Sequence, residues 1–234
     1  MAVVLALFAL VVWLLFAAVC ARIVLDQPRS RPRLQDEPLV GLAYQFVRLY
    51  VSLVHRARAT GLSHVPQRRD AGPLIVVSNH TAGVDPMLIQ AFLPCEVTWM
   101  MGRDMMMPGF ADIWDFLSII AVEREGTGKA GRDMVALRRA VKTLKAGGVV
   151  GIFPEGHIPA SAKVGEFSPG VGMLMLLSGA PALVTRVSGT PRADRAWKSL
   201  LQRSYSRVEF LGVVHAHEGE KAEALTARLR AMFA

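Results

Sequence analysis

His80 and Asp85, with four residues between them, are the pair in this sequence whose types and spacing best suit proton transfer. The stretch that contains them, residues 78–86, follows the apolar run 74–77. A neutral imidazole can remove a proton from a hydroxyl near neutral pH, and a carboxylate on its other ring nitrogen fixes the tautomer and stabilises the imidazolium. A turn from a strand into a helix can bring the two side chains together. The pair is therefore a candidate general base with its orienting acid.

The same pair also has an explanation without catalysis. Asp85 precedes Pro86, and proline suits the first turn of a helix, so Asp85 can be the N-cap of a helix that begins there. His80 is then an ordinary turn residue. The spacing alone favours this second explanation, and other residues have to decide between the two.

An acid and an arginine follow two further apolar runs. Glu155 and Gly156 come after the run 149–153, and Arg124 comes after the run 119–122. Because the carboxyl ends of parallel strands meet at one edge of a sheet, the glutamate is expected to face the same crevice as the histidine. The arginine could hold a phosphate through two parallel hydrogen bonds. Taken singly, Pro-Glu-Gly is also a common turn, and the arginine is also explained as a solvated side chain.

From about residue 56 the chain alternates short apolar runs with helical stretches. This pattern predicts an α/β fold with helices flanking a mixed, mostly parallel sheet. Strands are predicted at residues 56–60, 74–78, 97–101, 118–122, 149–153, 182–187 and 208–213. Helices are predicted where apolar residues recur at three- and four-residue steps, around residues 134–145, 171–178 and 221–232.

The N-terminal segment has the composition of a membrane anchor. No charged residue occurs from Ala2 to Ala21, and as a helix this segment would span about 30 Å, the thickness of a bilayer core. A cleaved signal peptide is the competing interpretation, but no basic residue precedes the apolar run. Arginines flank only its C-terminal side, so the positive-inside rule leaves the rest of the chain on the cytoplasmic face of the inner membrane.

An amphipathic helix is predicted at residues 39–54, after a proline-containing linker. Its apolar face is covered either by the domain core or by the bilayer interface, and the neighbouring anchor and arginines favour the interface. The chain then divides into a membrane-binding part, residues 1–55, and a catalytic α/β domain, residues 56–234.

The formal charge of +8 is concentrated after the predicted anchor, with nine arginines and three acidic residues between Arg22 and Arg69. Such a cluster suits an anionic lipid surface better than nucleic acid, for which the sequence has no motif. A basic solvated surface without a specific partner is the alternative. The two cysteines, Cys20 and Cys95, do not make a disulfide framework.

Taken together, these residues resemble the PlsC-type glycerolipid acyltransferases, which include the 1-acylglycerol-3-phosphate (lysophosphatidic acid) acyltransferases. The resemblance runs from about residue 56 to residue 190. The preceding apolar and amphipathic helices are similar to the membrane-binding front end of that family. The motifs that carry the resemblance are Asn79-His80-x4-Asp85, Gly102-Arg103 through Val122-Glu123-Arg124, and Phe153-Pro154-Glu155-Gly156.

The resemblance implies a role for each of these positions. His80 would be the general base that takes the proton of the acceptor hydroxyl, and Asp85 would orient it. Arginines would bind the acceptor's phosphate, and the Glu-Gly turn would shape the acceptor site. No covalent acyl-enzyme and no cofactor is implied, with acyl-CoA or acyl-carrier protein as co-substrate. The implied substrate-binding residues are Arg103, Arg124, Glu155 and Gly156.

No metal is expected either. His215 and His217, with Glu218 beside them, have the spacing of a ligand cluster, but they lie outside the motif region.

The chain departs from the family's usual pattern in two places. Where the family continues Glu-Gly with Thr-Arg-Ser, this chain reads His157-Ile158-Pro159, so a common phosphate-binding arginine is missing. A later apolar strand lacks the usual proline and carries Arg186, which could supply a replacement charge. These departures bear on the identity of the acceptor more than on the type of reaction.

The sequence therefore predicts a membrane-bound O-acyltransferase of phospholipid biosynthesis, which moves a fatty acyl group to the hydroxyl of a lysophospholipid, most simply lysophosphatidic acid. Two alternatives stay open. The acceptor could be another lysolipid, such as a lyso-aminolipid, because Ile158 stands where arginine is usual. The chain could also be a membrane-anchored lipid-binding protein of the same fold without turnover.

Overall fold

The computed structural model describes residues 38–66, 72–106, 109, 111–123, 130–159, 164–193 and 195–234. The predicted membrane anchor and Arg124 lie outside these ranges. Within them, no helix combines the length and the apolar character that crossing a membrane requires. The chain divides into two compact units, Met1–Tyr50 and Val51–Ala234.

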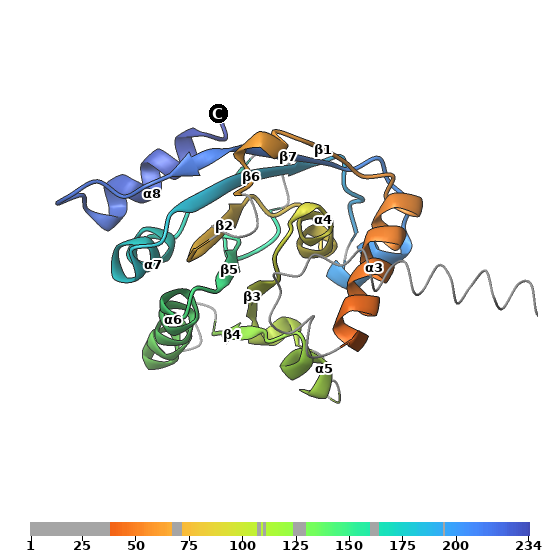
Figure 1. Cartoon of the computed structure of the whole chain (residues 1–234), viewed down its shortest axis with the longest axis horizontal. Coiled ribbons are helices and arrows are strands. Elements are labelled where there is room, and N and C mark those ends of the chain that lie inside the picture. The colour runs from red at the N-terminus through yellow and green to blue at the C-terminus, as the bar shows by residue number, and fades with distance from the viewer. Residues whose placement is uncertain are drawn as a thin grey trace, which may run out of the picture. The chain divides into compact units, whose positions relative to one another are not determined.

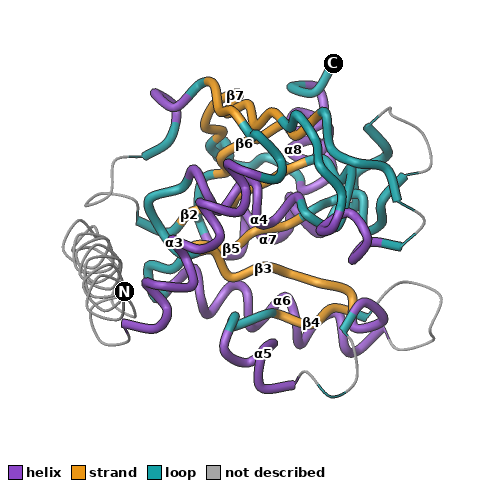
Figure 2. The backbone as a smooth tube through the Cα atoms, turned by 90° about the vertical axis from the view of Figure 1, so that its right-hand side faces the viewer, coloured by secondary structure: helices purple, strands orange, loops and turns teal. Residues whose placement is uncertain are grey.

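Seven strands of the second unit form one mixed sheet in the spatial order β1-β7-β6-β2-β5-β3-β4 (Figure 1, Figure 2). Neighbouring strands are parallel except for β6 and β7, which are antiparallel. The central strand β2 is buried along its whole length, as expected of a parallel strand covered on both faces. The strands are β1 (Arg58–Thr60), β2 (Leu74–Ser78), β3 (Val97–Gly102), β4 (Ile120–Val122), β5 (Val149–Ile152), β6 (Ala182–Ser188) and β7 (Arg207–Val214).

Helices lie on both faces of this sheet (Figure 1). Three of them, α6, α7 and α8, contribute to the core on one face, and α4 packs against β6 on the other. The helices of the described chain are α3 (Pro38–Leu53), α4 (Asp85–Phe92), α5 (Ala111–Phe116), α6 (Ala130–Lys145), α7 (Gly170–Ser178) and α8 (Ala222–Ala231). Short 3-10 helices are η1 (Leu62–His64), η2 (Arg103–Met105) and η3 (Ala196–Leu201).

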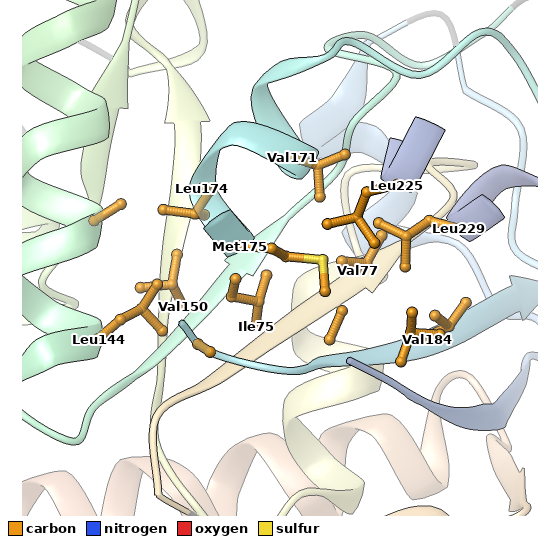
Figure 3. Close-up of a cluster of buried hydrophobic side chains, with 14 of the residues drawn as sticks. Ile75, Val77, Leu144, Val150, Val171, Leu174, Met175, Val184, Leu225 and Leu229 are labelled. Atoms are coloured by element: carbon orange, nitrogen blue, oxygen red, sulfur yellow. The ribbon is translucent and has the colours of Figure 1, made fainter. Parts of the chain in front are cut away.

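The main hydrophobic core fills the space between the sheet and the helices α6, α7 and α8 (Figure 3). Ile75 and Val77 project from β2 into this core, because alternate residues of a strand face the same side. Met175 of α7 and Leu225 of α8 are fully buried among them. Burial of one such side chain contributes roughly 1.5–3 kcal/mol, so this layer holds the strands whose ends carry the site.

All seven predicted strands are present, and two of them begin later than predicted. Arg56 has a φ of 42° and Ser118 a φ of 53°, and neither left-handed conformation can continue a strand. β1 therefore starts at Arg58 and β4 at Ile120. The three helices predicted for the domain are α6, α7 and α8, whereas the six-residue α5 is too short for a helical period to show in the sequence.

The amphipathic helix predicted at residues 39–54 is present as α3, which crosses the border between the two units. Several of its apolar side chains are exposed, among them Phe46 and Leu53. Contact of this helix with a bilayer interface stays a prediction.

Candidate active site

The loop between β2 and α4 brings the predicted pair together at the carboxyl edge of the parallel strands. Nδ1 of His80 lies 2.9 Å from Oδ2 of Asp85. The aspartate side chain is fully buried, and the histidine side chain is 17% exposed. Among the described residues, none hydrogen-bonds to Nε2 of His80. A histidine that donates its Nδ1–H to a carboxylate can accept a proton at Nε2 from a molecule that enters the site.

Asp85 is held by the loop that precedes it. The backbone N–H groups of Thr81 and Ala82 donate to its Oδ2 at 2.6 and 2.8 Å, and the Thr81 hydroxyl donates to its Oδ1 at 3.1 Å. Val84 is the N-cap of α4, without a side-chain capping bond, and Asp85 is the first helical residue. The alternative in which Asp85 only caps a helix is therefore wrong, because its carboxylate closes the loop back onto the histidine.

A stack of aromatic rings supports the histidine ring. The His80 and Phe153 ring centroids are 4.2 Å apart at 19°, and those of Phe153 and Trp99 are 5.2 Å apart at 13°. Gly151 of β5 makes room for this stack, because a Cβ there would lie 2.3 Å from the Trp99 ring. A glycine inside a strand signals a close approach by another group, but the sequence does not say that Trp99 is that group.

Glu155 lies just after β5 and is nearly buried. Its Oε1 accepts the backbone N–H of His80 at 2.8 Å, and its Oε2 accepts that of Gly165 at 2.8 Å. Gly156 closes the turn with a φ of 70°, a conformation that favours glycine, and donates its N–H to the Phe153 carbonyl at 3.0 Å. The predicted proximity of glutamate and histidine is present, and the contact is to the histidine backbone rather than to its ring.

Arg103 follows β3 and is 61% exposed. Its Nε lies 2.9 Å from Oε1 of Glu123, which follows β4, so this ion pair links the ends of two neighbouring strands. The pair places one predicted phosphate-binding arginine at the same edge of the sheet as His80. The other, Arg124, lies outside the described residues.

The model of the acyltransferase family matches residues 56–187, which is more than half of the chain and includes this site. The chain belongs to the acyltransferase family. Its structure is also similar to the crystal structure of the 1-acyl-sn-glycerophosphate (LPA) acyltransferase, PlsC, from Thermotoga maritima, with a TM-score of 0.65 and 19% identity. The match covers 94% of this chain and 86% of that one, so the acyltransferase has the PlsC-type fold.

Two supports of the acyltransferase site come from residues far along the chain. The side chain of Asn79 donates to the Val187 carbonyl at 3.0 Å and accepts its N–H at 2.8 Å, so the loop is tied to β6. The Thr190 hydroxyl donates to the Thr81 hydroxyl at 2.8 Å. No local pattern in the sequence indicates a role for Val187 or Thr190.

Arg186 is the residue that could supply a replacement charge for the acceptor. Its Nη1 lies 3.5 Å from Oε2 of Glu209 on β7, and its Nη2 donates to the carbonyl of Met232, just after α8, at 3.3 Å. These contacts account for the guanidinium and give the predicted role no support.

The histidines near the C-terminus take part in a local polar cluster. Nε2 of His217 lies 2.7 Å from Nη1 of Arg228, whose Nη2 donates to the His215 carbonyl and to Glu220. Within the described ranges, no group of three or more His, Cys, Asp or Glu side chains is arranged to hold a metal ion.

Proposed function

We propose that this acyltransferase moves a fatty acyl group from a thioester, acyl-CoA or acyl-carrier protein, to the hydroxyl of a lysophospholipid at the cytoplasmic face of the inner membrane. Lysophosphatidic acid is the simplest acceptor. The observation that supports the proposal most is the 2.9 Å contact between His80 Nδ1 and the buried carboxylate of Asp85. Because this contact uses Nδ1, Nε2 of the same ring can accept the proton of the acceptor hydroxyl.

In the proposed reaction, Nε2 of His80 takes the proton of the acceptor hydroxyl while the hydroxyl oxygen attacks the thioester carbonyl. Asp85 keeps its hydrogen bond to Nδ1 and stabilises the imidazolium. The new C–O bond forms, the C–S bond breaks, and the leaving thiolate takes the proton from the imidazolium. The histidine returns to its neutral form, and neither an acyl-enzyme nor a metal is required.

A phosphate on the acceptor would meet positive charge at the same edge of the sheet. Arg103 follows β3 there, and Arg124 follows the neighbouring strand β4 in the sequence. The similar structure from Thermotoga maritima is described as acting on 1-acyl-sn-glycerophosphate, which supports the same class of acceptor. Guanidinium groups suit phosphate because they bind it through paired hydrogen bonds.

A second acceptor has an observation in its favour. Ile158 occupies the position after Glu155-Gly156-His157 where the family's phosphate-binding arginine is usual. A lysolipid with another headgroup, such as a lyso-aminolipid, would not need that arginine.

The test is acyl transfer by the purified full-length chain in lipid nanodiscs, with acyl-CoA or acyl-carrier protein and a panel of lysolipids. Mass spectrometry should detect phosphatidic acid, and His80→Ala should lower the rate by about 10²–10⁴-fold, the range of a general base. Product formed from a lyso-aminolipid alone would favour the second acceptor. Lysolipid binding without transfer from either thioester would contradict both and leave a non-catalytic lipid-binding protein.

A further inference from the structure

Residues 195–207 comprise the later part of the connection from β6 to β7 and the first residue of β7, and they lie beyond the part of the chain that the family model matches. Leu201 is 76% exposed and Tyr205 71% exposed, the highest values among large hydrophobic side chains in the described ranges. Trp197, in the same segment, is 45% exposed. Single exposed apolar residues are common on proteins, but a group of large ones in one short segment marks an interaction surface.

The same segment is strongly basic and has no acidic residue. Exposure alternates between residues 203 and 207, so Arg203, Tyr205 and Arg207 face outward while the serines between them are buried. Exposed apolar and basic side chains therefore alternate along the same segment. The basic residues of the segment are Arg195, Lys198, Arg203 and Arg207.

Arg56 adds to this surface from a distant part of the chain. Its guanidinium carbon lies 5.1 Å from the centre of the Tyr205 ring and the guanidinium donates to the Tyr205 hydroxyl. Its left-handed φ of 42° is uncommon for arginine, so the backbone is held in a special conformation where this contact forms. Two residues further on, Arg58 of β1 lies opposite Arg207 of β7 in the register of the two parallel strands. Both segments contribute basic and no acidic side chains.

One end of this surface contacts the loop that carries His80. Gly83 lies between His80 and Asp85, and a Cβ there would be 2.4 Å from the carbonyl oxygen of Ala196, the first residue of η3. Only glycine permits so close an approach. Whatever holds η3 in place therefore also sets the position of the loop that carries His80.

We propose that Trp197, Leu201 and Tyr205, with the arginines around them, form a docking surface for an anionic lipid bilayer. Leu201 enters the headgroup region, and the two aromatic rings lie at the level where tryptophan and tyrosine are enriched. The arginines are attracted to the anionic headgroups. Docking places the His80 loop at the bilayer from which a lysolipid acceptor arrives, and this last step rests on the proposed function.

The exposed side chain of Leu201 favours a bilayer over an acidic protein as the partner of this surface. An acidic protein, such as an acyl-carrier protein, would match the charge of this surface, but its charged groups would not bury the most exposed apolar side chain of the segment. A bilayer accommodates an aliphatic tip, amphipathic rings and guanidinium groups at once.

The first test places an environment-sensitive fluorophore on the full-length chain through Leu201→Cys, in a background of Cys20→Ser and Cys95→Ser. The matched control is Leu177→Cys, on the exposed side of α7, a helix that packs on the opposite face of the sheet from α4. With vesicles of phosphatidylglycerol and phosphatidylcholine, emission from position 201 should shift to the blue and be quenched by brominated lipid chains. Emission from position 177 should do neither.

Three results of this test would overturn the proposal. The two positions could respond alike, the response at position 201 could be equal on purely zwitterionic vesicles, or a soluble acidic carrier protein could produce it without vesicles. The measurement needs no acyl transfer, so its outcome is separate from that of the proposed function.

The second test combines Leu201→Asp with Arg203→Ser. Loss of one basic residue near an anionic surface weakens binding about fivefold, and loss of the apolar tip adds to this, so transfer to a vesicle-bound acceptor should fall about tenfold or more. Transfer to a short-chain acceptor that is monomeric in water should not change. Equal losses on both acceptors would overturn the proposal, because they would indicate damage to the catalytic loop.

Discussion

His55 and His80 are both fixed through Nδ1, and their surroundings differ in charge and access. Nδ1 of His55 lies 2.8 Å from the Ser204 hydroxyl, which is itself 2.8 Å from the Ser206 hydroxyl. His55 is fully buried. Nδ1 of His80 meets a carboxylate at 2.9 Å, and its side chain is partly exposed.

This difference separates a structural histidine from a candidate base. Burial lowers the pKa of His55, because a charged imidazole loses its hydration there. A buried ring is also out of reach of a substrate. At His80 the carboxylate can stabilise an imidazolium, and Nε2 can meet an acceptor. A carboxylate partner and access to the second nitrogen are therefore the features that make His80 the candidate base, more than the hydrogen bond alone.

The largest expected effect comes from the same substitution at both histidines. His80→Gln should lower kcat by about 10²–10⁴-fold, because glutamine cannot take the acceptor's proton. His55→Gln should leave kcat unchanged at temperatures where the protein is folded, because that side chain does not reach the site. Initial rates with acyl-CoA and lysophosphatidic acid check both, with circular dichroism as the control for folding. A comparable loss in folded His55→Gln would remove the distinction between the two histidines.

A smaller effect is expected at Glu155, whose carboxylate positions the backbone of His80 without touching its ring. Glu155 accepts the backbone N–H groups of His80 and Gly165. In Glu155→Gln the amide oxygen can still accept one of them, but the amide NH₂, itself a donor, faces the other. Loss of one hydrogen bond to a charged group should lower kcat by about 10- to 100-fold, with little change in KM. Separate measurement of kcat and KM checks this.

The matched control for Glu155 is Glu166→Gln, at a side chain that is 93% exposed, and it should alter neither constant. A rise in the acceptor's KM at constant kcat would show instead that Glu155 contacts the acceptor. That result would support the role that the resemblance implied for this residue.

The strands and the members of the site could be predicted because both depend on local patterns. Apolar runs such as residues 74–78 define strands, and the ends of parallel strands converge, which brings His80 and Glu155 to one edge. How they touch could not be predicted. The bond from Asn79 to Val187 joins residues 108 positions apart, and the ring stack depends on how β3 packs on β5. The left-handed backbone at Arg56 and Ser118 also moved two strand boundaries. At Ser118 it belongs to the turn that ends α5, where the Ser118 N–H donates to the Asp115 carbonyl and the Ile119 N–H to the Trp114 carbonyl.

The smallest expected effect is a dependence of stability on pH at His55. Burial lowers its folded pKa below the ordinary value of 6.5, so the unfolded chain takes up a proton at a higher pH than the folded chain does. The contribution of neutral His55 to the stability of the folded protein is fully present above about pH 6.5. It is lost as the pH falls toward the lower folded pKa. Acid should therefore destabilise the protein in part through this residue.

His55→Gln isolates this contribution, because glutamine can still hydrogen-bond to Ser204 and does not titrate. Its melting temperature should fall less than that of the wild type between about pH 7.5 and about pH 5.5, by a few degrees. The remaining titratable groups are the same in both proteins, so the difference between the two pH profiles reports His55. Parallel profiles would mean that the folded and unfolded chains protonate this histidine alike. The contrast between a buried neutral histidine and a carboxylate-paired base would then rest on access to Nε2 alone.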